Sequence, residues 1–433
     1  MDGLSDLPKA ILHDIQARLP DKDAAKTSAL SKAWRDAWFS FPNLSICSQD
    51  FFTIHDVSPR NSHRFSKMDI LIDSVTKRLM RLGDRGLAIK EFKLNLKTLY
   101  DLMHVSHHMD LWIQMASDCG VEVLELHLTY GWIGRGYIQN KWYDLPLCVI
   151  EAKSLTKLVL ASGIRIDQEF LSHSMKFSSL KLLSLSGVLF TQEGVIEHLI
   201  AHCPRIEHLT VKHCFVYNHL SPEVPQVYRI YRMKSLFLNG LQKLKQVDIH
   251  EIQEVHVDSP NLENLLFYIH SNHSAPFKLN FNSCTNLRCL SLCCLRGIDF
   301  GDKWFLELFS KFPFLERLKL DNCSMSRSIN ISSTQLKVLE LLHCSNLKEV
   351  NIYAQNLSSF VYRGIHQPVI SFLRSSKQLE VKGYHCSLRE FVKNIKPQNI
   401  LASASLFISQ LFPIEPKQGD LIVSSIPPSI KGV

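Results

Sequence analysis

Residues 315–320 read "LERLKL", and residues 336–341 repeat the same order of residue types as "LKVLEL". The order is apolar, two others, apolar, one other, apolar. It is present from residue 121 to residue 362. The other copies are "VEVLEL" (121–126), "LTKLVL" (155–160), "LKLLSL" (180–185), "IEHLTV" (206–211), "MKSLFL" (233–238), "LKQVDI" (244–249), "IQEVHV" (252–257), "LENLLF" (262–267), "LRCLSL" (287–292), "LKEVNI" (347–352) and "LSSFVY" (357–362).

The second half of this order alternates, so it predicts a strand with its leucines on one face. One such unit cannot bury its apolar face alone, and the units must stack. Several copies recur after 25 to 28 residues, which is within the range of leucine-rich repeats. Others recur after 10 or 11 residues, with room only for a turn between parallel strands. We therefore expect an α/β fold, a curved solenoid with a parallel sheet and irregular helices.

The long intervals have room for helices. Residues 191–204, "TQEGVIEHLIAHCP", predict one with Thr191 as its N-cap, and residues 301–313 predict another that Pro313 ends. The repeats are expected to span residues 121–385. Residues 386–433 are less regular, and we expect a C-terminal cap followed by a poorly ordered tail.

Residues 46–120 are expected to form a spacer that caps the open end of the solenoid. Residues 65–82 and 107–120 have helical periodicity, and Gly120 is suited to end the second helix. Residues 89–96, "IKEFKLNL", alternate like a strand.

The first 45 residues predict three short helices. Ser5 or Asp6 caps the first helix, with Pro8 in its first turn, where a missing N–H costs nothing. Pro20 ends it. Asp21 caps a second helix, "KDAAKTSAL", and Ser31 caps a third, "KAWRDAWFSF".

So short a three-helix head cannot enclose much apolar surface. The residues alone leave two interpretations open: a helical cap on the solenoid, or an exposed docking patch. The head also shows a pattern of pairs and anchors. These are Leu7-Pro8, Ile11-Leu12, Leu19-Pro20, Lys22-Asp23, Thr27-Ser28, Leu30-Ser31-Lys32 and Trp34-Arg35 with Trp38.

In this pattern the head closely resembles the F-box of plant F-box/leucine-rich-repeat proteins. The resemblance is specific over residues 4–45 and looser over 100–360. Lys9 stands where the family usually has an acidic residue, and Ala33 where it usually has Arg or Lys. The resemblance implies a non-catalytic receptor subunit of a Skp–cullin–F-box ubiquitin ligase. The head would dock a Skp-type adaptor, and through it a cullin–RING ligase, while the repeats recruit a target protein.

The residues that the resemblance assigns to adaptor binding are Leu7, Pro8, Ile11, Leu12, Ile15, Leu19, Pro20, Leu30, Ser31, Trp34 and Trp38. The alternative is a repeat protein that binds partners without any coupling to ubiquitination, its head serving only as a cap.

Composition and motifs argue against other classes. The net charge of +8 is scattered, whereas a nucleic-acid surface clusters its Lys and Arg. No signal peptide or membrane span is apparent, so we expect a chain of the cytoplasm or nucleus with reduced thiols.

No catalytic motif is found; "GWIGRGY" (131–137) lacks the order of a nucleotide-binding loop. We predict no cofactor and no metal site. The cysteines at 284–294 have no C-x2-C spacing, and Cys214, Cys323 and Cys344 occupy turn positions of repeats.

Residues between the leucines should lie on the concave face of the solenoid and bind the target. Their charges have no dominant sign, so they do not indicate a ligand class. The candidates for target binding are His208, Phe237, Asp248, His256, Arg317 and Lys319.

Overall fold

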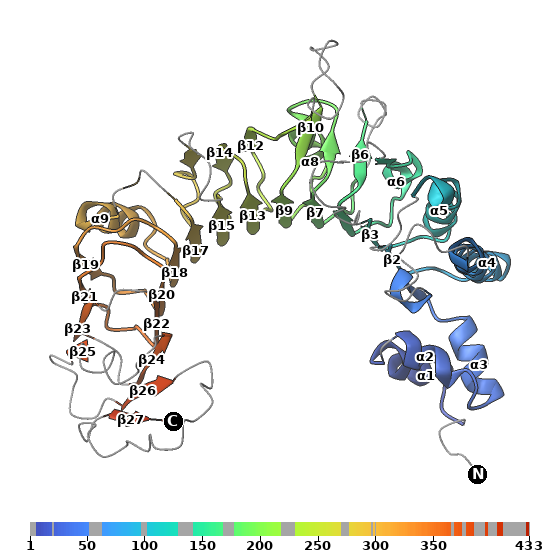
Figure 1. Ribbon diagram of the computed structural model, residues 1–433, viewed down its shortest axis with the longest axis horizontal. Coiled ribbons are helices and arrows are strands. Elements are labelled where there is room, and N and C mark those ends of the chain that lie inside the picture. The colour runs from blue at the N-terminus through green and yellow to red at the C-terminus, as the bar shows by residue number, and fades with distance from the viewer. Residues whose placement is uncertain are drawn as a thin grey trace. The chain divides into compact units, whose positions relative to one another are not determined.

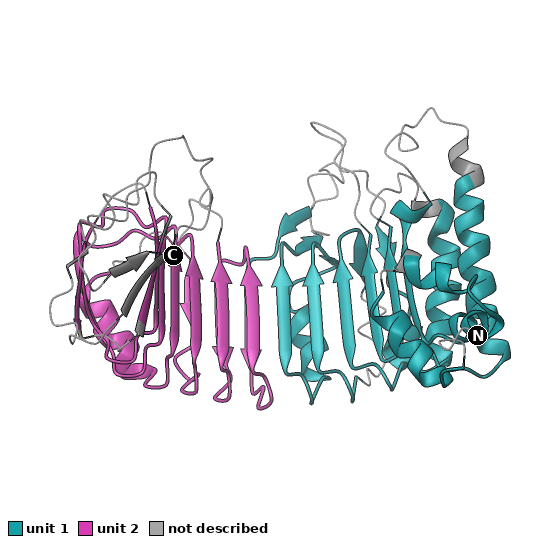
Figure 2. Cartoon of the chain, turned by 90° about the horizontal axis from the view of Figure 1, so that it is seen from below, with its two compact units in different colours: residues 1–234 teal, residues 235–433 magenta. Residues whose placement is uncertain are grey.

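The protein is described from a computed structural model. The described residues are 6–19, 21–51, 63–96, 102–128, 142–167, 177–217, 230–269, 277–295, 298, 300–364, 368–374, 378–384, 395–396, 405–409 and 430–432. The chain divides into two compact units, residues 1–234 and 235–433, shown in two colours in Figure 2. Pro20, the loop 131–137 and most of the tail after residue 386 lie outside the described residues.

The first unit begins with three helices, at the blue end of the chain in Figure 1: α1 (Lys9–Ala17), α2 (Asp21–Thr27) and α3 (Lys32–Phe39). Ser31 caps α3 as predicted, since its Oγ accepts a hydrogen bond from the Trp34 N–H at 3.3 Å. The prediction that Ser5 or Asp6 caps α1 is wrong, because the N-cap lies two residues after Asp6 and three after Ser5. Pro8 is itself the N-cap, because its ψ of 143° is extended and no side chain caps the helix.

A parallel sheet follows the head. Its strands lie in the order β1 (Asn43–Cys47), β2 (Glu91–Asn95), β3 (Val123–His127), β5 (Lys157–Ala161), β7 (Leu182–Ser186) and β9 (His208–Lys212). Helices α4 (His63–Asp84) and α5 (Leu102–Asp118) come after β1 and β2, close to the predicted positions. Gly120, at φ +78°, follows α5 and donates its N–H to the Ser117 carbonyl at 3.0 Å, as a helix end requires.

The expectation that the stack of strands starts at residue 121 is wrong, because β1 and β2 already belong to it. Both strands carry the repeat order, as "FPNLSI" (41–46) and "IKEFKL" (89–94). The spacer therefore continues the sheet of the repeats rather than covering its end.

A second layer of the first unit consists of short strands. These are β4 (Tyr143–Asp144), β6 (Ile164–Ile166), β8 (Leu189–Phe190) and β10 (Phe215–Tyr217), with β11 (Ile230–Arg232) antiparallel to β10. Short helices α6 (Cys148–Glu151) and α8 (Val195–Ala201) and a 3-10 turn, η1 (Ser48–Asp50), complete this unit. Thr191 does not cap α8, contrary to the prediction. The helix starts after Gly194, whose φ of +83° turns the chain there.

The second unit has the same two layers. Its main sheet orders β13 (Gln246–His250), β15 (Asn264–Tyr268), β17 (Cys289–Cys293), β18 (Arg317–Asp321), β20 (Val338–Leu342), β22 (Ser359–Arg363), β24 (Gln378–Tyr384), β26 (Ser405–Ser409) and β27 (Ile430–Gly432), all parallel. The other layer holds β12 (Ser235–Asn239), β14 (Glu254–Asp258) and β16 (Lys278–Asn280), then α9 (Asp302–Lys311), then β19 (Ser328–Ser332), β21 (Glu349–Tyr353), β23 (Val369–Arg374) and β25 (Ile395–Lys396).

The closely spaced copies of the repeat order alternate between these two layers. β21 begins 11 residues after β20 but pairs with β19 and β23, and β22 then returns to the main sheet. The intervals of 10 or 11 residues therefore join strands of different layers, not neighbours within one sheet. Each layer buries one face of its strands against the other, so both need the same alternation. The predicted α/β fold on parallel strands is confirmed.

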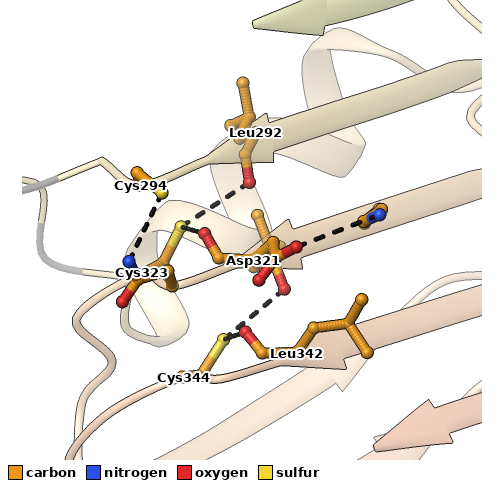
Figure 3. A network of polar contacts seen from close by, with 9 residues as sticks. Leu292, Cys294, Asp321, Cys323, Leu342 and Cys344 are labelled. Atoms are coloured by element: carbon orange, nitrogen blue, oxygen red, sulfur yellow. Dashed lines mark hydrogen bonds and ion pairs between the residues drawn. The ribbon is translucent and has the colours of Figure 1, made fainter. Parts of the chain in front are cut away.

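Buried thiols line the turns that leave the main sheet. Cys214, Cys323 and Cys344 are at most 3% exposed, as predicted for their turn position. In Figure 3 the Cys323 thiol donates to the carbonyls of Leu292 (3.7 Å) and Asp321 (3.4 Å), so it bridges two repeats. Burial raises the pKa of Cys323 to about 12. These cysteines are neutral packing groups.

Candidate docking site

The three-helix head has a small core of its own. Leu12, Trp34 and Ala37 are 2%, 3% and 0% exposed, and Leu7 and Ile15 pack against them half-buried. Leu12 and Trp34 were expected to bind an adaptor, and the structure instead buries both within the head. Three short helices supply few apolar side chains, and the largest of them are needed to hold the helices together.

Polar contacts also hold the helices of the head together. The Gln16 side chain, 1% exposed, donates from Nε2 to Thr27 Oγ1 at 2.9 Å and so joins α1 to the end of α2. His13 Nε2 lies 3.0 Å from the Ala37 carbonyl oxygen at the end of α3. Burial is the main cause that lowers the pKa of His13, which favours the neutral ring at this contact.

Other apolar side chains of the head remain in contact with solvent. Ile11 on α1 is 43% exposed and Leu30, after α2, is 63% exposed. Pro8, directly before α1, is exposed too, and Leu19 is half-buried. We call Pro8, Ile11 and Leu30 the head surface. The core of the head does not need these three, and all three were among the predicted adaptor-binding residues.

Trp38 faces a different neighbour. Its ring stacks on Phe41, with centroids 6.2 Å apart and planes 18° apart, and the Arg78 guanidinium of α4 lies 4.0 Å from its centroid. Arg81 lies 4.2 Å from the ring of Phe39 in the same way. Such cation–π contacts favour close packing of the two segments. The structure therefore uses Trp38, also predicted for adaptor binding, to pack the head against α4.

The predicted target residues divide between sheets. His208 on β9, in the first unit, and Asp248, Arg317 and Lys319, in the second unit, lie on main-sheet strands and point away from the buried leucines. His256, on β14, belongs to the other layer of the second unit. The expectation of one shared concave face is therefore wrong for His256.

Phe237, on β12, belongs to that other layer too, and it is 43% exposed there. It is directly opposite His256 in the register of β12 and β14. His256 Nδ1 in turn accepts a hydrogen bond from the Asn280 side-chain amide at 3.0 Å. A target that contacts Arg317 and Lys319 would therefore approach the main sheet of this unit. It would not approach the layer that holds Phe237 and His256.

Charges on the main sheet of the second unit are mostly paired. Lys319 Nζ lies 4.0 Å from Asp321 Oδ2, and His250 Nε2 lies 2.8 Å from Asp248 Oδ1. Glu316, at the start of β18, lies 3.0 Å from Lys337 Nζ and 3.3 Å from Arg288. The Lys337 hydrogen bond is the main cause that lowers the pKa of Glu316.

The histidines of α5 do not gather into a metal site. His104 Nε2 lies 3.8 Å from Asp69 Oδ1 on α4, and the His108 ring lies 6.2 Å from that of Trp112. Among the described residues, no three His, Cys, Asp or Glu side chains are arranged to hold a metal ion. None of the described helices is both long enough and apolar enough to cross a membrane.

A helical head with exposed apolar side chains, joined to repeats that stack leucines between parallel sheets, defines a leucine-rich-repeat protein with a small helical domain at its start. Comparison with known families agrees. Residues 4–46 match the F-box domain. Residues 109–292 match the model described as "FBD-associated F-box protein At5g56370, LRR repeats", and residues 276–396 match "At1g61320/AtMIF1, LRR domain". The chain thus combines an F-box with leucine-rich repeats, as plant F-box/leucine-rich-repeat proteins do.

Similar proteins are found in Arabidopsis thaliana. A putative F-box/FBD/LRR-repeat protein is 26% identical over 82% of this chain and 78% of its own length. A putative F-box/LRR-repeat protein is 28% identical over 63% of this chain and 55% of its own length. An F-box/LRR-repeat protein is 29% identical over 49% and 44%. The chain thus spans about half the length of the last two. A Leptospira interrogans LRR protein aligns with a TM-score of 0.28, which does not establish a shared fold.

Proposed function

We propose that this chain is the substrate-receptor subunit of a Skp–cullin–F-box E3 ubiquitin ligase. The head docks a Skp-type adaptor and through it a cullin–RING ligase, and the leucine-rich repeats recruit a target protein. The chain itself is non-catalytic and acts in the cytoplasm, the nucleus or both. The observation that carries the proposal is the head surface, which lies within the region that matches the F-box domain.

The exposure of Ile11 and Leu30 is the physical argument for docking. A head that served only as a cap would gain stability by turning these side chains inward, at about 1.5–3 kcal/mol for each fully buried one. Their retention on the surface of α1 and after α2 fits recognition of a helix face in an apolar groove. Each anchor that the adaptor buries would contribute about 2 kcal/mol to binding.

The division of the head into core and surface decides which substitutions test docking. Trp34 is in the core of the head, so its removal would disturb folding and would not report on docking. Ile11→Lys and Leu30→Lys alter exposed positions and leave the buried contacts of Leu12, Trp34 and Ala37 in place. Leu306→Lys is the matched control, because Leu306 on α9 is 73% exposed and lies in the other unit.

The experiment measures the affinity of the full-length chain for a purified plant Skp-type adaptor. We expect wild type and Leu306→Lys to bind equally. The double variant Ile11→Lys/Leu30→Lys should bind at least 100-fold more weakly, from about 1.4 kcal/mol or more lost at each anchor. Far-ultraviolet circular dichroism checks that all three chains are folded.

A wild-type chain that does not bind the adaptor would refute the ligase proposal. The remaining function would then be that of a leucine-rich-repeat scaffold that binds partners without ubiquitination. Equal binding by the double variant and the wild type would show that docking, if present, does not use the head surface.

A further inference from the structure

In the second unit, the layer that packs on the main sheet changes from strand to helix between β16 and α9. A pocket lies at this change. Its volume is about 380 Å³. Neighbouring strands of a sheet are about 4.8 Å apart, whereas a helix with its side chains is about 10 Å wide. A helix that follows an edge strand cannot approach it as closely as another strand would, so space is left between them.

The walls of the pocket are held at both ends of α9. At the start of the helix, the Asp302 carboxylate accepts hydrogen bonds from the Asn330 backbone N–H and side-chain amide, both at 2.7 Å, which holds α9 against β19. At its end, the Phe312 ring stacks on Phe281, which follows β16, with centroids 5.1 Å apart. The space between these two attachments is therefore built into the layer.

The inside of the pocket is apolar and largely aromatic. One wall of the pocket belongs to β16 and its neighbouring residues and consists of Phe277, Leu279 and Phe281. Another wall belongs to α9 and the residue after it and consists of Trp304, Leu308 and Phe312. Trp304 makes edge contacts with Phe300 at 4.7 Å and with Phe305 at 5.1 Å, which fix the plane of its indole. Pockets of this size and lining are typical of small-molecule sites.

One end of the pocket is polar and rich in hydrogen-bond donors. Lys311 Nζ donates to Asn282 Oδ1 at 3.1 Å, and both residues line the pocket. Among the described residues, Lys311 has no carboxylate within ion-pair distance. The other charged residue of the lining, Glu307, is 3.9 Å from Lys303 instead. Two N–H groups of Lys311 therefore remain to donate to a ligand.

We propose that this pocket binds a small amphiphilic anion, an aromatic or aliphatic carboxylate. The apolar body would contact the rings of Phe277, Phe281 and Trp304, and the carboxylate would accept hydrogen bonds from the Lys311 ammonium. Charge complementarity decides the class of ligand, because the unpaired charge at the pocket is a cation. The site lies in the second unit and does not depend on adaptor docking, so either proposal can fail without the other.

The test uses 2-naphthoate and its uncharged analogue 2-naphthamide, titrated calorimetrically into the full-length chain. We expect one site per chain and about tenfold tighter binding of the carboxylate, the worth of one charge-assisted hydrogen bond. Lys311→Gln changes an exposed side chain and should remove this preference while binding of the amide persists. Lys348→Gln, at an exposed position of the second unit that does not line the pocket, is the matched control and should behave as wild type.

Leu279→Trp fills the pocket from β16 and should abolish binding of both compounds. Circular dichroism and an unchanged midpoint of thermal unfolding check that this variant is folded. No binding of 2-naphthoate to the wild-type chain at millimolar concentration overturns the proposal. So does a preference for the carboxylate that survives Lys311→Gln, a test that does not depend on the filled variant folding.

Discussion

The residue that directly follows a strand repeatedly adopts the left-handed conformation. His213, Cys294, Asn322 and His343 have φ values of +51°, +61°, +53° and +51°. Other strands end on glycine at the same place, as at Gly187. This conformation costs a residue with a Cβ about 1–2 kcal/mol. The turn is kept because it sends the chain from the main sheet into the next layer.

At His343 this strain predicts a graded response to substitution. We expect His343→Gly to be as stable as the wild type or more stable, by up to about 1 kcal/mol, because glycine adopts positive φ without strain. His343→Val should lose about 1–2 kcal/mol, since a β-branched side chain tolerates this conformation least. Urea unfolding measures both. A valine variant as stable as the wild type would contradict the account of the turn.

The buried thiols make the stability of the second unit sensitive to alkaline pH. Burial raises the pKa of Cys323 and of Cys344 from about 9 to about 12. In the unfolded chain both thiols ionise near pH 9, while in the folded chain they stay neutral. Their contribution to stability is therefore complete below pH 9 and is lost as the pH rises from 9 towards 12.

The variant Cys323→Ala/Cys344→Ala tests this pH dependence. It should be less stable at pH 7, because two buried side chains are truncated, but its free energy of unfolding should fall less between pH 8.5 and pH 10.5. Denaturant titrations at both pH values compare it with the wild type. Identical slopes with pH would contradict neutral buried thiols.

At the scale of the element, the head illustrates how one short sequence serves two purposes. Helix α1 turns Leu12 and Gln16 inward and leaves Ile11 exposed. Helix α3 buries Trp34 in the head and packs Trp38 beside Arg78 of α4. The helices therefore depend on a few large buried side chains, while the proposed docking depends on the exposed ones.

Removing Trp34 should accordingly unfold the head without unfolding the repeats. Trp34→Ala deletes a side chain that is 3% exposed, at a cost of about 3–5 kcal/mol, which is a large share for so small a core. Amide hydrogen exchange should speed up across α1–α3 while the main-sheet strands keep their protection. Ile11→Lys should leave the exchange of α1–α3 unchanged. Fast exchange in both variants would contradict the assignment of core and surface.

The sequence predicts these elements unevenly, for physical reasons. Strands that carry the apolar alternation, and caps such as Ser31, are local properties and were predicted. The alternation cannot say to which layer a strand belongs, because β20 and β21 both bury one face. Residues 89–96 were predicted to be a strand, but β1 was missed and neither strand was assigned to the sheet of the repeats, because the long helices α4 and α5 separate β1, β2 and β3 by intervals wider than those of the later repeats. Which apolar residues of the head are buried depends on how the helices pack, and no spacing rule gave this for Trp34.

At the scale of the whole molecule, the chain combines an F-box head with a long series of leucine-rich repeats. The F-box match and the exposed Ile11 and Leu30 support coupling to a ligase through the head. The charges of the main sheet are partly paired within the chain, as between Lys319 and Asp321. The pocket beside α9 was not predicted, because it arises where β16 gives way to α9 in the layer that packs on the main sheet and leaves no local signal in the sequence.

The most direct test of the central claim is the footprint of the Skp-type adaptor on this chain. Hydrogen–deuterium exchange of the full-length protein, with and without adaptor, measures it. We predict slower exchange in α1 and in the turn that holds Leu30, with no change in the main-sheet strands of the second unit. An adaptor that binds and protects the repeats instead, or leaves α1 unprotected, would contradict the assignment of the head as the docking module.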